Sequence, residues 1–554
     1  MTKVKFVRNF SDLPSFDPNS PVFLDTETAG LYGEVRLLQL YQPTTDSAHV
    51  YIIDFALYEG SIQQVRDYLN ILWVVCHNAT YDLYVLNIVP KKVDDTLYLS
   101  KIAFPNLGVE DIGEGRGFGL DKVCYRLGIS SIYGELKKSE MQKSGFGMDD
   151  IISLEQLQYA ATDVIALSMI WPHLEQYRQV KCYQLDILSL IYAAQYCRNG
   201  MSMDTDQVAK ELAETQIEYD ANIPKLNGLN INSPKQCKEA LGTESSDKPT
   251  LLRLIAEGNE LAKLIYDQRR LGKRITMLTS YLHPKTYTVF NVAGAATGRF
   301  TATGKGIKYG INAQQIPRKS KHLFVSTDPN IATIEADYST LELRLAAAIF
   351  GDTNMAQQLR DGKDLHTEVA KALAGKEEIS KDDRFKAKAV NFGFVYGMSA
   401  KSFREYAFLN YDLVLSEAEA INWRNTYFRL YPDIAKYHKK IWETYKNPGF
   451  LQYTALGRPV KPKLGTDAIN SPVQGTGAEC TKLALHYMVK ENPNTLKCVV
   501  NVVHDSIKLE VPKEGKEYWC EMLERNMIRA WHEMCKCDLF KYKDIPIKVD
   551  VEVK

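Results

Sequence analysis

The sequence predicts a chain of several domains, in which an α/β region is followed by a region of mixed α+β character. The first observation is length, because 554 residues at roughly 150 residues per domain correspond to three or four folded units. The second is that short strand-like runs precede a helical pattern in the first third of the chain. The third is that the last 230 or so residues combine long helical patterns with two strand-like acidic segments.

The first region contains short β-branched and aromatic runs at residues 21–24, 50–54 and 71–76, which are typical of strands. Apolar residues from Ser153 to Met169 follow helical spacing. About the first 170 residues are therefore expected to form an α/β domain. The pattern from Cys182 to about Leu282 is helical, with one break at residues 241–249, and predicts an extended helical arm.

The remainder of the chain alternates helices with two acidic strand ends. Asp337 follows the strand-like run 332–336, and Asp505 lies between the apolar runs 498–503 and 507–509. Helical patterns are expected at residues 353–375, 382–396, 416–447, 475–490 and 514–537.

The charge of the chain is balanced in total but unevenly distributed. Lys and Arg number 68, and so do Asp and Glu, which gives no compositional indication of a polyanionic partner. Yet residues 268–327 contain no acidic residue, where the chain's average predicts about seven, and they contain eleven Lys or Arg. A solvated basic face would explain such a run, and so would a surface that lies against phosphates.

The cysteines and the hydropathy exclude several classes of protein. Ten cysteines include no Cys-x-x-Cys and no cluster with zinc-site spacing, so reduced and mostly buried thiols are expected. No uninterrupted apolar run approaches the roughly 18 residues of a membrane span, and the N-terminus has no signal or transit pattern. These patterns predict a cytoplasmic protein with no membrane partner.

Acidic residues mark a first candidate site in the N-terminal region. Asp25 and Glu27 lie two apart on a predicted strand, so both carboxylates project from one face and favour a bound cation. By itself this pair is equally compatible with an ordinary strand end. The segment His77–Asp82 follows, and then Tyr159 and Asp163, which share one helix face.

Together these residues resemble the three motifs of the DnaQ-like (DEDD) 3′–5′ exonucleases, in the variant that carries tyrosine. The resemblance implies that Asp25, Glu27, Asp82 and Asp163 bind two divalent metal ions about 4 Å apart. It implies that Asp25, Glu27 and Tyr159 are catalytic, with Tyr159 orienting the attacking water. All five positions are filled, so an active exonuclease is expected.

A helix in the C-terminal half carries a second candidate site. Arg384, Lys388, Phe392 and Tyr396 recur every fourth residue and form one helix stripe. Two cations followed by two aromatic rings suit a nucleoside triphosphate, although an amphipathic helix with an aromatic edge would show the same spacing.

The neighbouring motifs decide between these alternatives. Residues 337–344, 384–397 and 503–506 closely resemble motifs A, B and C of family A DNA polymerases, the bacterial DNA polymerase I type. Segments 297–299, 311–317, 427–432, 456–458 and 470–475 resemble further motifs of that family, and 198–204 and 231–236 resemble parts of its thumb. The resemblance covers nearly the whole chain.

This resemblance implies an RNase H-like exonuclease domain followed by a right-hand polymerase with a helical thumb, an antiparallel β palm and helical fingers. The expected boundaries are 1–178 for the exonuclease, 179–285 for the thumb, 286–350 and 451–554 for the palm, and 351–450 for the fingers. An exonuclease that begins within 25 residues of Met1 leaves no room for a 5′-nuclease domain. That organisation is similar to phage replicative polymerases.

The resemblance also implies roles for individual residues. Asp337 and Asp505 are expected to hold two Mg²⁺ ions, which Mn²⁺ can replace, and Lys388 is a candidate proton donor to pyrophosphate. Glu342 is expected to exclude a 2′-OH, which favours DNA over RNA synthesis. Nucleotide-binding residues are expected to be Arg384, Lys388, Phe392, Tyr396, Glu342 and His366. DNA-binding residues are expected to be Arg299, Asn312, Gln314, Asn470, Gln474 and His504.

The resulting hypothesis is a template-directed DNA polymerase with 3′–5′ proofreading, a replicative role and a phage origin, whose partners are primer–template DNA and dNTPs. One alternative is a 3′–5′ nuclease with a DNA-binding but weakly active polymerase half, and another is a relative of single-subunit RNA polymerases. Ser506 replaces a glutamate that is usual in motif C, which puts metal preference in doubt. Replisome partners such as a helicase, primase, single-strand binding protein or processivity factor are not specified by the sequence.

Overall fold

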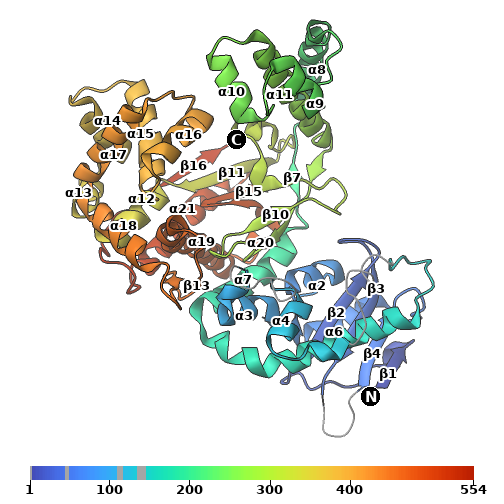
Figure 1. Cartoon of the computed structure of the whole chain (residues 1–554). Coiled ribbons are helices and arrows are strands. Elements are labelled where there is room, and N and C mark those ends of the chain that lie inside the picture. Colours follow the sequence, from blue (N-terminus) through green and yellow to red (C-terminus); the bar gives the residue numbers. More distant parts are fainter. Residues whose placement is uncertain (1–2, 44–48, 109–116, 134–144) are drawn as a thin grey trace.

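A computed structural model describes residues 3–43, 49–108, 117–133 and 145–554. In Figure 1 the blue N-terminal region lies apart from a larger body, in which a green helical arm and an orange group of helices flank a central sheet. No helix in the described ranges is long and apolar enough to cross a membrane. All ten cysteines are free thiols and eight are buried, which confirms the expectation of reduced, mostly buried cysteines.

The N-terminal region is built on a six-stranded mixed sheet with the order β1-β4-β3-β2-β5-β6. Strand β2 is antiparallel to β3 and parallel to β5, so it occupies the interior of the sheet. The strands are β1 (Lys3–Val7), β2 (Val22–Thr28), β3 (Val35–Tyr41), β4 (His49–Asp54), β5 (Trp73–Cys76) and β6 (Lys92–Asp95). The three predicted strands correspond to β2, β4 and β5.

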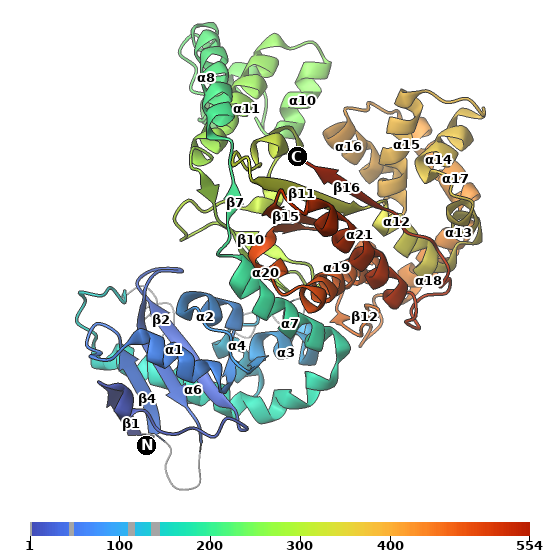
Figure 2. The same cartoon turned by 180° about the vertical axis from the view of Figure 1, so that it is seen from behind.

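Helices cover this sheet and continue toward the rest of the chain. The 21-residue helix α6 (Leu154–Leu174) packs against β2 and β3, and Ser153 begins it with a capping box. Helix α7 (Lys181–Tyr196) then runs from the blue region to the larger body (Figure 2). The smaller helices are α1 (Ile62–Asn70), α2 (Ala79–Leu86), α3 (Thr96–Ala103) and α4 (Leu120–Arg126).

The helical arm has more interruptions than the sequence predicted. After α7 the chain forms the short strand β7 (Met201–Ser202), which pairs with β8 (Lys285–Thr286), and the arm itself starts at Thr205. Its tip has a small hydrophobic core of its own, which includes Leu226, Cys237 and Ile265. The helices are α8 (Thr205–Asn222), α9 (Pro234–Leu241), α10 (Lys248–Ala256) and α11 (Glu260–Ser280).

The larger body centres on a four-stranded antiparallel sheet with the order β14-β15-β11-β16. Helices α19 (Gly465–Glu491) and α21 (Lys516–Met534) pack against each other, and α21 also packs against the sheet strands (Figure 2). The strands are β11 (Ile331–Tyr338), β14 (Val499–Val503), β15 (Ser506–Pro512) and β16 (Val549–Val553). Short elements nearby are β9 (Val289–Asn291), β10 (Thr301–Thr303), β12 (Gln452–Tyr453), β13 (Pro459–Val460) and α20 (Thr495–Cys498).

The orange helices differ from the predicted ones at their boundaries. The expected helix 353–375 is two helices, because Gly362 adopts a φ of +70° and the Asp364 side chain then caps a new helix. The expected helix 416–447 is also divided, since Pro432 stands at the first position of a second helix. The helices are α12 (Leu341–Ala346), α13 (Thr353–Arg360), α14 (Leu365–Ala374), α15 (Lys381–Phe394), α16 (Ala400–Tyr411), α17 (Glu417–Leu430) and α18 (Pro432–Thr444).

Two further differences concern site residues. Helix α15 ends at Phe394, so Tyr396 lies just beyond the helix whose stripe was expected to include it. Helix α19 starts ten residues before the expected position 475 and contains Pro472. Residues 465–474 look like a loop in sequence because Gly465 and Pro472 are poor helix formers, but neighbouring elements bury most of this segment and stabilise the helix.

Candidate active sites

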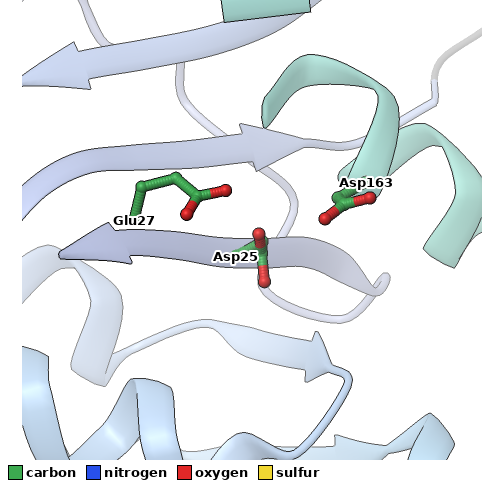
Figure 3. A group of neighbouring side chains, drawn as sticks. All are labelled: Asp25, Glu27 and Asp163. Carbon is green, nitrogen blue, oxygen red and sulfur yellow. The ribbon is translucent and has the colours of Figure 1, made fainter. Parts of the chain in front are cut away.

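The first acidic site lies where β2 meets α6. Asp25 and Glu27 project from β2 toward Asp163 of α6, and carboxylate oxygens of the three lie within 4.8 Å of one another (Figure 3). Such a set of oxygen ligands fits a hard divalent cation. In the described residues this is the one group of three or more acidic, His or Cys side chains with this geometry.

Asp82, a fourth predicted metal ligand, lies outside that group of three. Its side chain is 2% exposed and accepts a hydrogen bond of 2.7 Å from the Thr26 hydroxyl, between Asp25 and Glu27 on β2. Burial and the nearby negative charge of Asp25 raise the pKa of Asp82 well above its usual range. The structure therefore places Asp82 next to the cluster, close enough for the charge of Asp25 to raise its pKa.

Two tyrosines hold Asp163, and the sequence pointed to only one of them. Tyr159, 2% exposed on the same helix, hydrogen-bonds the Asp163 carboxylate, and burial together with that carboxylate raises the Tyr159 pKa. The Tyr133 hydroxyl donates to Asp163 Oδ1 at 2.9 Å, from 30 residues before it in the chain. Both tyrosines therefore remain protonated donors. Tyr133 is in no motif, and no periodic pattern could have identified it.

Asp95 is a second residue that the sequence did not single out. It is fully buried at the end of β6 and caps α3 through the backbone N–H groups of Leu97 and Tyr98. The same carboxylate accepts the N–H of Ala79 at 2.8 Å and so fixes the start of α2, the helix that carries Asp82. Burial raises the Asp95 pKa to about 6.

The second acidic site lies on the central sheet. Asp337 is near the end of β11, and Asp505 is in the turn between β14 and β15. Asp337 is directly opposite Ser506 in the β11–β15 register, so the two aspartates are neighbours. Burial raises the pKa of both side chains, and the nearby charge of Asp337 adds to the rise for Asp505.

Cationic residues surround Glu335, which lies two residues before Asp337 on the same face of β11. Its carboxylate pairs with Lys321 at 2.9 Å and with Lys554 at 3.2 Å, and it accepts a hydrogen bond of 3.3 Å from Ser506. These cations lower the Glu335 pKa to about 2, although burial opposes the shift. Lys321 also lowers the pKa of Asp337. The sequence analysis had not assigned Glu335 a role.

Glu342 connects the central sheet region with the end of α15. Its carboxylate accepts hydrogen bonds from Arg299 and, at 2.6 Å, from the Tyr396 hydroxyl. The structure thus brings three residues with different predicted roles into one contact. Glu342 and Tyr396 line a hollow of about 960 Å³ together with Phe392, Asn470 and Gln474.

The remaining predicted nucleotide-binding residues lie along α15 and at the start of α14. Arg384 donates to Asp364 Oδ2 at 2.8 and 2.5 Å, and Lys388 lies 6.0 Å from the Phe392 ring centroid. Asn391 donates to His366 Nδ1 at 2.9 Å, which leaves Nε2 as the protonated nitrogen. Burial lowers the His366 pKa to about 4, so the ring is neutral at pH 7.

The predicted DNA-binding residues lie on several separate elements of the larger body. Gln314 donates to the carbonyl of Val502 at 3.3 Å and so ties its loop to β14, while Asn312 caps the turn that carries Gln314. The Asn470 side-chain oxygen is buried without a partner in the described residues. His504 is exposed in the β14–β15 turn with a φ of +55°.

The acid-free tract 268–327 is only partly available for an anionic ligand. Arg274 pairs with Glu211 at 2.6 Å, Lys321 with Glu335, and Arg299 with Glu342. Acidic residues from other segments thus neutralise some of its positive charge. The sequence could show the local excess of cations but not these distant partners.

Comparisons with known proteins assign both regions of the chain to families. Residues 202–554 match the family described as DNA polymerase family A, and residues 5–177 match the family described as 3′-5′ exonuclease. A DNA polymerase I of Aquifex aeolicus is 29% identical over 584 aligned residues, which cover 96% of this chain and 95% of that protein. A DNA polymerase I of Geobacillus stearothermophilus is 31% identical over 381 residues, which cover 60% of this chain and 42% of that protein.

The fold has a counterpart among solved structures. One described as "POL domain of Pol1 from M. smegmatis complex with DNA primer-template and dNTP" has a TM-score of 0.74 and 19% identity, and the match covers 96% of this chain and 94% of that one. This likeness, with the two family matches, confirms the predicted fold class. It leaves the roles of individual residues and the predicted domain boundaries as predictions.

Proposed function

Because the chain belongs to DNA polymerase family A and carries a 3′–5′ exonuclease domain, we propose that it copies a DNA template by adding dNTPs to a primer 3′-OH and removes mismatched ends. The observation that supports synthesis most directly is the pair Asp337 and Asp505, which two distant segments bring together on one edge of the central sheet. Two adjacent carboxylates on a rigid sheet can hold divalent cations at a fixed position.

The residues of each acidic site fit divalent cations, for which we propose Mg²⁺ with Mn²⁺ as a substitute. When bound, such ions supply Lewis acidity to phosphoryl transfer, activating the attacking oxygen and stabilising the leaving one. Asp337 and Asp505 would hold them for synthesis. Asp25, Glu27, Asp163 and the adjacent Asp82 would hold them for excision.

The start of α14 and the exposed face of α15 form the proposed nucleotide site. Lys388 and Arg384 would contact the triphosphate, and Arg384 would exchange its ion pair with Asp364 for phosphate oxygens. His366, neutral with its proton on Nε2, would donate a hydrogen bond rather than supply a charge. Lys388 would also give a proton to the departing pyrophosphate.

The contact among Glu342, Arg299 and Tyr396 is proposed to shape the nucleotide site. Glu342 is held from two sides, so its side chain cannot move away from an incoming sugar and would exclude a 2′-OH. Phe392 would lie against the nucleotide, and Tyr396 would lie near the templating base. Asn470, Gln474, Arg299 and His504 would contact the minor groove, where hydrogen-bond acceptors are common to all base pairs.

The exonuclease site would remove a mismatched primer end. Tyr159 would orient the attacking water, and Tyr133 would hold Asp163 in place. A cleft of about 730 Å³ lies between the two regions, and its lining includes His77 and Lys101 on the exonuclease side and Lys461, Asn470 and Gln474 on the polymerase side. The described geometry thus offers an open cleft between the two regions.

A replicative role, a phage origin and the division into exonuclease, thumb, palm and fingers at the stated boundaries remain predictions. Primer–template DNA and dNTPs are the proposed partners, in line with the complex described for the M. smegmatis relative. The alternative of a nuclease with a weakly active polymerase half requires a defective pair at Asp337 and Asp505.

Single-turnover extension of a matched primer tests the proposal. We expect the wild-type protein with Mg²⁺ to add each complementary dNTP, and Asp505→Ala to reduce that rate by roughly three orders of magnitude or more, because metal-ion stabilisation contributes several kcal/mol. Lys440→Ala, an exposed position on α18, serves as the control and should extend normally. Excision without extension by the wild type would favour the nuclease alternative.

A further inference from the structure

A cluster of charged side chains is buried where α7 packs against α19. Asp186 of α7 is 1% exposed, and its carboxylate accepts hydrogen bonds from Arg458 and, at 2.7 Å, from Lys482 of α19. Both cations are buried as well. Burial alone would raise the pKa of Asp186, but Arg458 and Lys482 lower it below its usual value, so the carboxylate is ionised.

Stability alone does not account well for this cluster. Each buried ion loses several kcal/mol of hydration, and apolar side chains of similar volume are often at least as stabilising. Two cations face one ionised carboxylate, and Glu479, buried beside them, supplies only part of the balance because burial raises its pKa to about 7. In several proteins buried charges are kept because they fix one arrangement of the chain.

The two cations contact the turn that carries Arg299. Lys482 Nζ donates to the carbonyl oxygen of Gly298 at 2.7 Å and lies 5.4 Å from the ring centroid of Phe300. Lys482 therefore contacts the residues on both sides of Arg299. Gly298 has a φ of +82°, and a Cβ there would lie 2.9 Å from the guanidinium carbon of Arg458, so only glycine fits.

Arg299 connects this turn with the nucleotide site. Its guanidinium pairs with the Glu342 carboxylate, which also accepts a hydrogen bond of 2.6 Å from the Tyr396 hydroxyl. A partly exposed ion pair gains little free energy by itself, because two long side chains lose rotamer freedom when it forms. A backbone that is fixed in advance at Arg299 removes part of this cost.

We propose that Asp186 and Lys482 are positioning residues for sugar selection, which hold the turn 297–299 so that Arg299 keeps Glu342 in the path of a 2′-OH. Asp186 orients the Lys482 ammonium, and Lys482 in turn fixes the backbone beside Arg299. The proposal rests on the proposed function, in which Glu342 excludes a 2′-OH. Because α7 continues from the exonuclease region, the helix that joins the two regions would help to set the choice of nucleotide (Figure 2).

Insertion of a single nucleotide opposite one template base tests the proposal, with kcat and KM measured for a dNTP and for the matching rNTP. Lys482→Met removes the donor to Gly298 and leaves Asp186 and Arg458 as a balanced ion pair. We expect the preference for the dNTP to fall about tenfold, chiefly through better rNTP insertion, with kcat for the dNTP within about threefold of wild type. Asp186→Asn should lower the preference less, because Lys482 keeps its bond to Gly298.

A double substitution tests whether Lys482 acts through Arg299. In a protein that already carries Arg299→Ala, adding Lys482→Met should change the preference for the dNTP by less than about twofold, because two residues in one chain of contacts are not additive. Lys541→Met is the matched control. Its Nζ likewise donates at 2.6 Å to a backbone carbonyl, that of Phe350, which precedes a glycine with a φ of +79°. This control should keep the wild-type preference.

The proposal is overturned if Lys482→Met, with an unchanged circular dichroism spectrum, keeps the wild-type preference. It is also overturned if dNTP and rNTP insertion fall by the same factor, as a merely structural role would cause, or if Lys482→Met has its full effect without Arg299. If Lys482→Met does not fold, Asp186→Asn decides by the same criteria. Wild-type dNTP insertion tests the proposed function separately, and normal wild-type selection with unchanged selection in the variants would reject only the positioning role.

Discussion

In the exonuclease region, one strand and one helix bring three carboxylates within 4.8 Å of one another, whereas in the polymerase region an aspartate on β11 meets an aspartate in the β14–β15 turn. Among the contacts seen around the first site, neutral hydroxyl groups donate: Tyr133 to Asp163 and Thr26 to Asp82. Beside the second site, Glu335 is paired with Lys321 and Lys554, and Lys321 also acts on Asp337.

The difference shows two ways to hold negative charge for a metal ion. Hydroxyl donors orient carboxylates but leave their mutual repulsion for the cation to relieve, as the raised pKa of Asp82 indicates. Lysines beside the second site offset part of its charge before any cation binds. Carboxylates of both sites nevertheless keep a raised pKa, Asp82 in the first and Asp505 in the second, so both sites retain repulsion that a bound cation would relieve.

The largest expected effect is the loss of excision in Asp163→Asn. Excision of a single-stranded oligonucleotide with Mg²⁺ should fall by roughly three orders of magnitude, because one of the three clustered carboxylates is lost and metal stabilisation is worth several kcal/mol. Tyr133→Phe keeps the ring and removes only the hydroxyl donor, so its loss should be nearer tenfold. Equal losses in the two variants would contradict the distinction between a ligand and its support.

The next effect concerns stability without metal. Asp25→Asn should stabilise the protein in EDTA by about 1 kcal/mol, because it relieves repulsion on Asp82. Glu335→Gln should destabilise it by about 1–3 kcal/mol, because Lys321 and Lys554 lose a partly buried partner. Urea unfolding in EDTA measures both, and a change of the same sign in the two variants would contradict the proposed difference between the sites.

The pH dependence of folding stability gives a further test of the second site. The folded-state pKa of Asp505 is raised above its unfolded value, so between these two pKa values the folded protein binds more protons than the unfolded chain. The contribution of Asp505 to stability is therefore greatest at low pH and is lost as pH rises through the folded pKa. The buried His366 and His438, each with a pKa lowered to about 4, act oppositely and cost stability as pH falls from about 6.5 to 4.

Thermal melting in EDTA should therefore show an Asp505 contribution that is full below about pH 4 and is lost between about pH 4 and pH 8, at no more than about 1.4 kcal/mol per pH unit. Asp505→Asn should remove this contribution and so reduce the loss of stability between pH 4 and pH 8. An unchanged slope in that variant would show that Asp505 does not carry the effect.

The smallest effect is expected for Ser506→Ala. Its hydroxyl donates a hydrogen bond of 3.3 Å to Glu335, a carboxylate that two lysines already hold. Stability should change by less than about 1 kcal/mol, and primer extension should fall less than fivefold. A larger loss of extension would contradict this expectation. It would show that Ser506, which stands where motif C usually has a glutamate, takes a direct part in the reaction.

The sequence predicted which helices and strands form better than it predicted where they begin and end or which distant residues contact the sites. Fixed spacing on a strand was enough to place Asp25 and Glu27 on one face, because positions two apart on a strand share a face, whereas Asp163 was grouped with them only through the resemblance to the exonuclease motifs. Tyr133, by contrast, reaches Asp163 from a segment with no periodic pattern. The start of α19 was missed because its Pro and Gly residues weaken local helix propensity, which tertiary packing overrides.

The ion pairs of the tract 268–327 were likewise not predictable from the sequence. Sequence spacing could show that residues 268–327 lack acids, but not that Glu211, Glu335 and Glu342 come from elsewhere to pair with Arg274, Lys321 and Arg299. Ion pairs between distant segments depend on the three-dimensional fold and leave no local pattern.

The most direct test of two separate acidic sites is the fate of a primer with a mismatched 3′ end, in the presence of Mg²⁺ and dNTPs, in wild type, Asp25→Ala and Asp505→Ala. We expect Asp25→Ala to lose excision and keep synthesis on a matched primer, and Asp505→Ala to lose synthesis and keep excision. If either single substitution abolishes both activities in a protein that remains folded, the two sites do not act independently, and the assignment of excision and synthesis to separate sites is wrong.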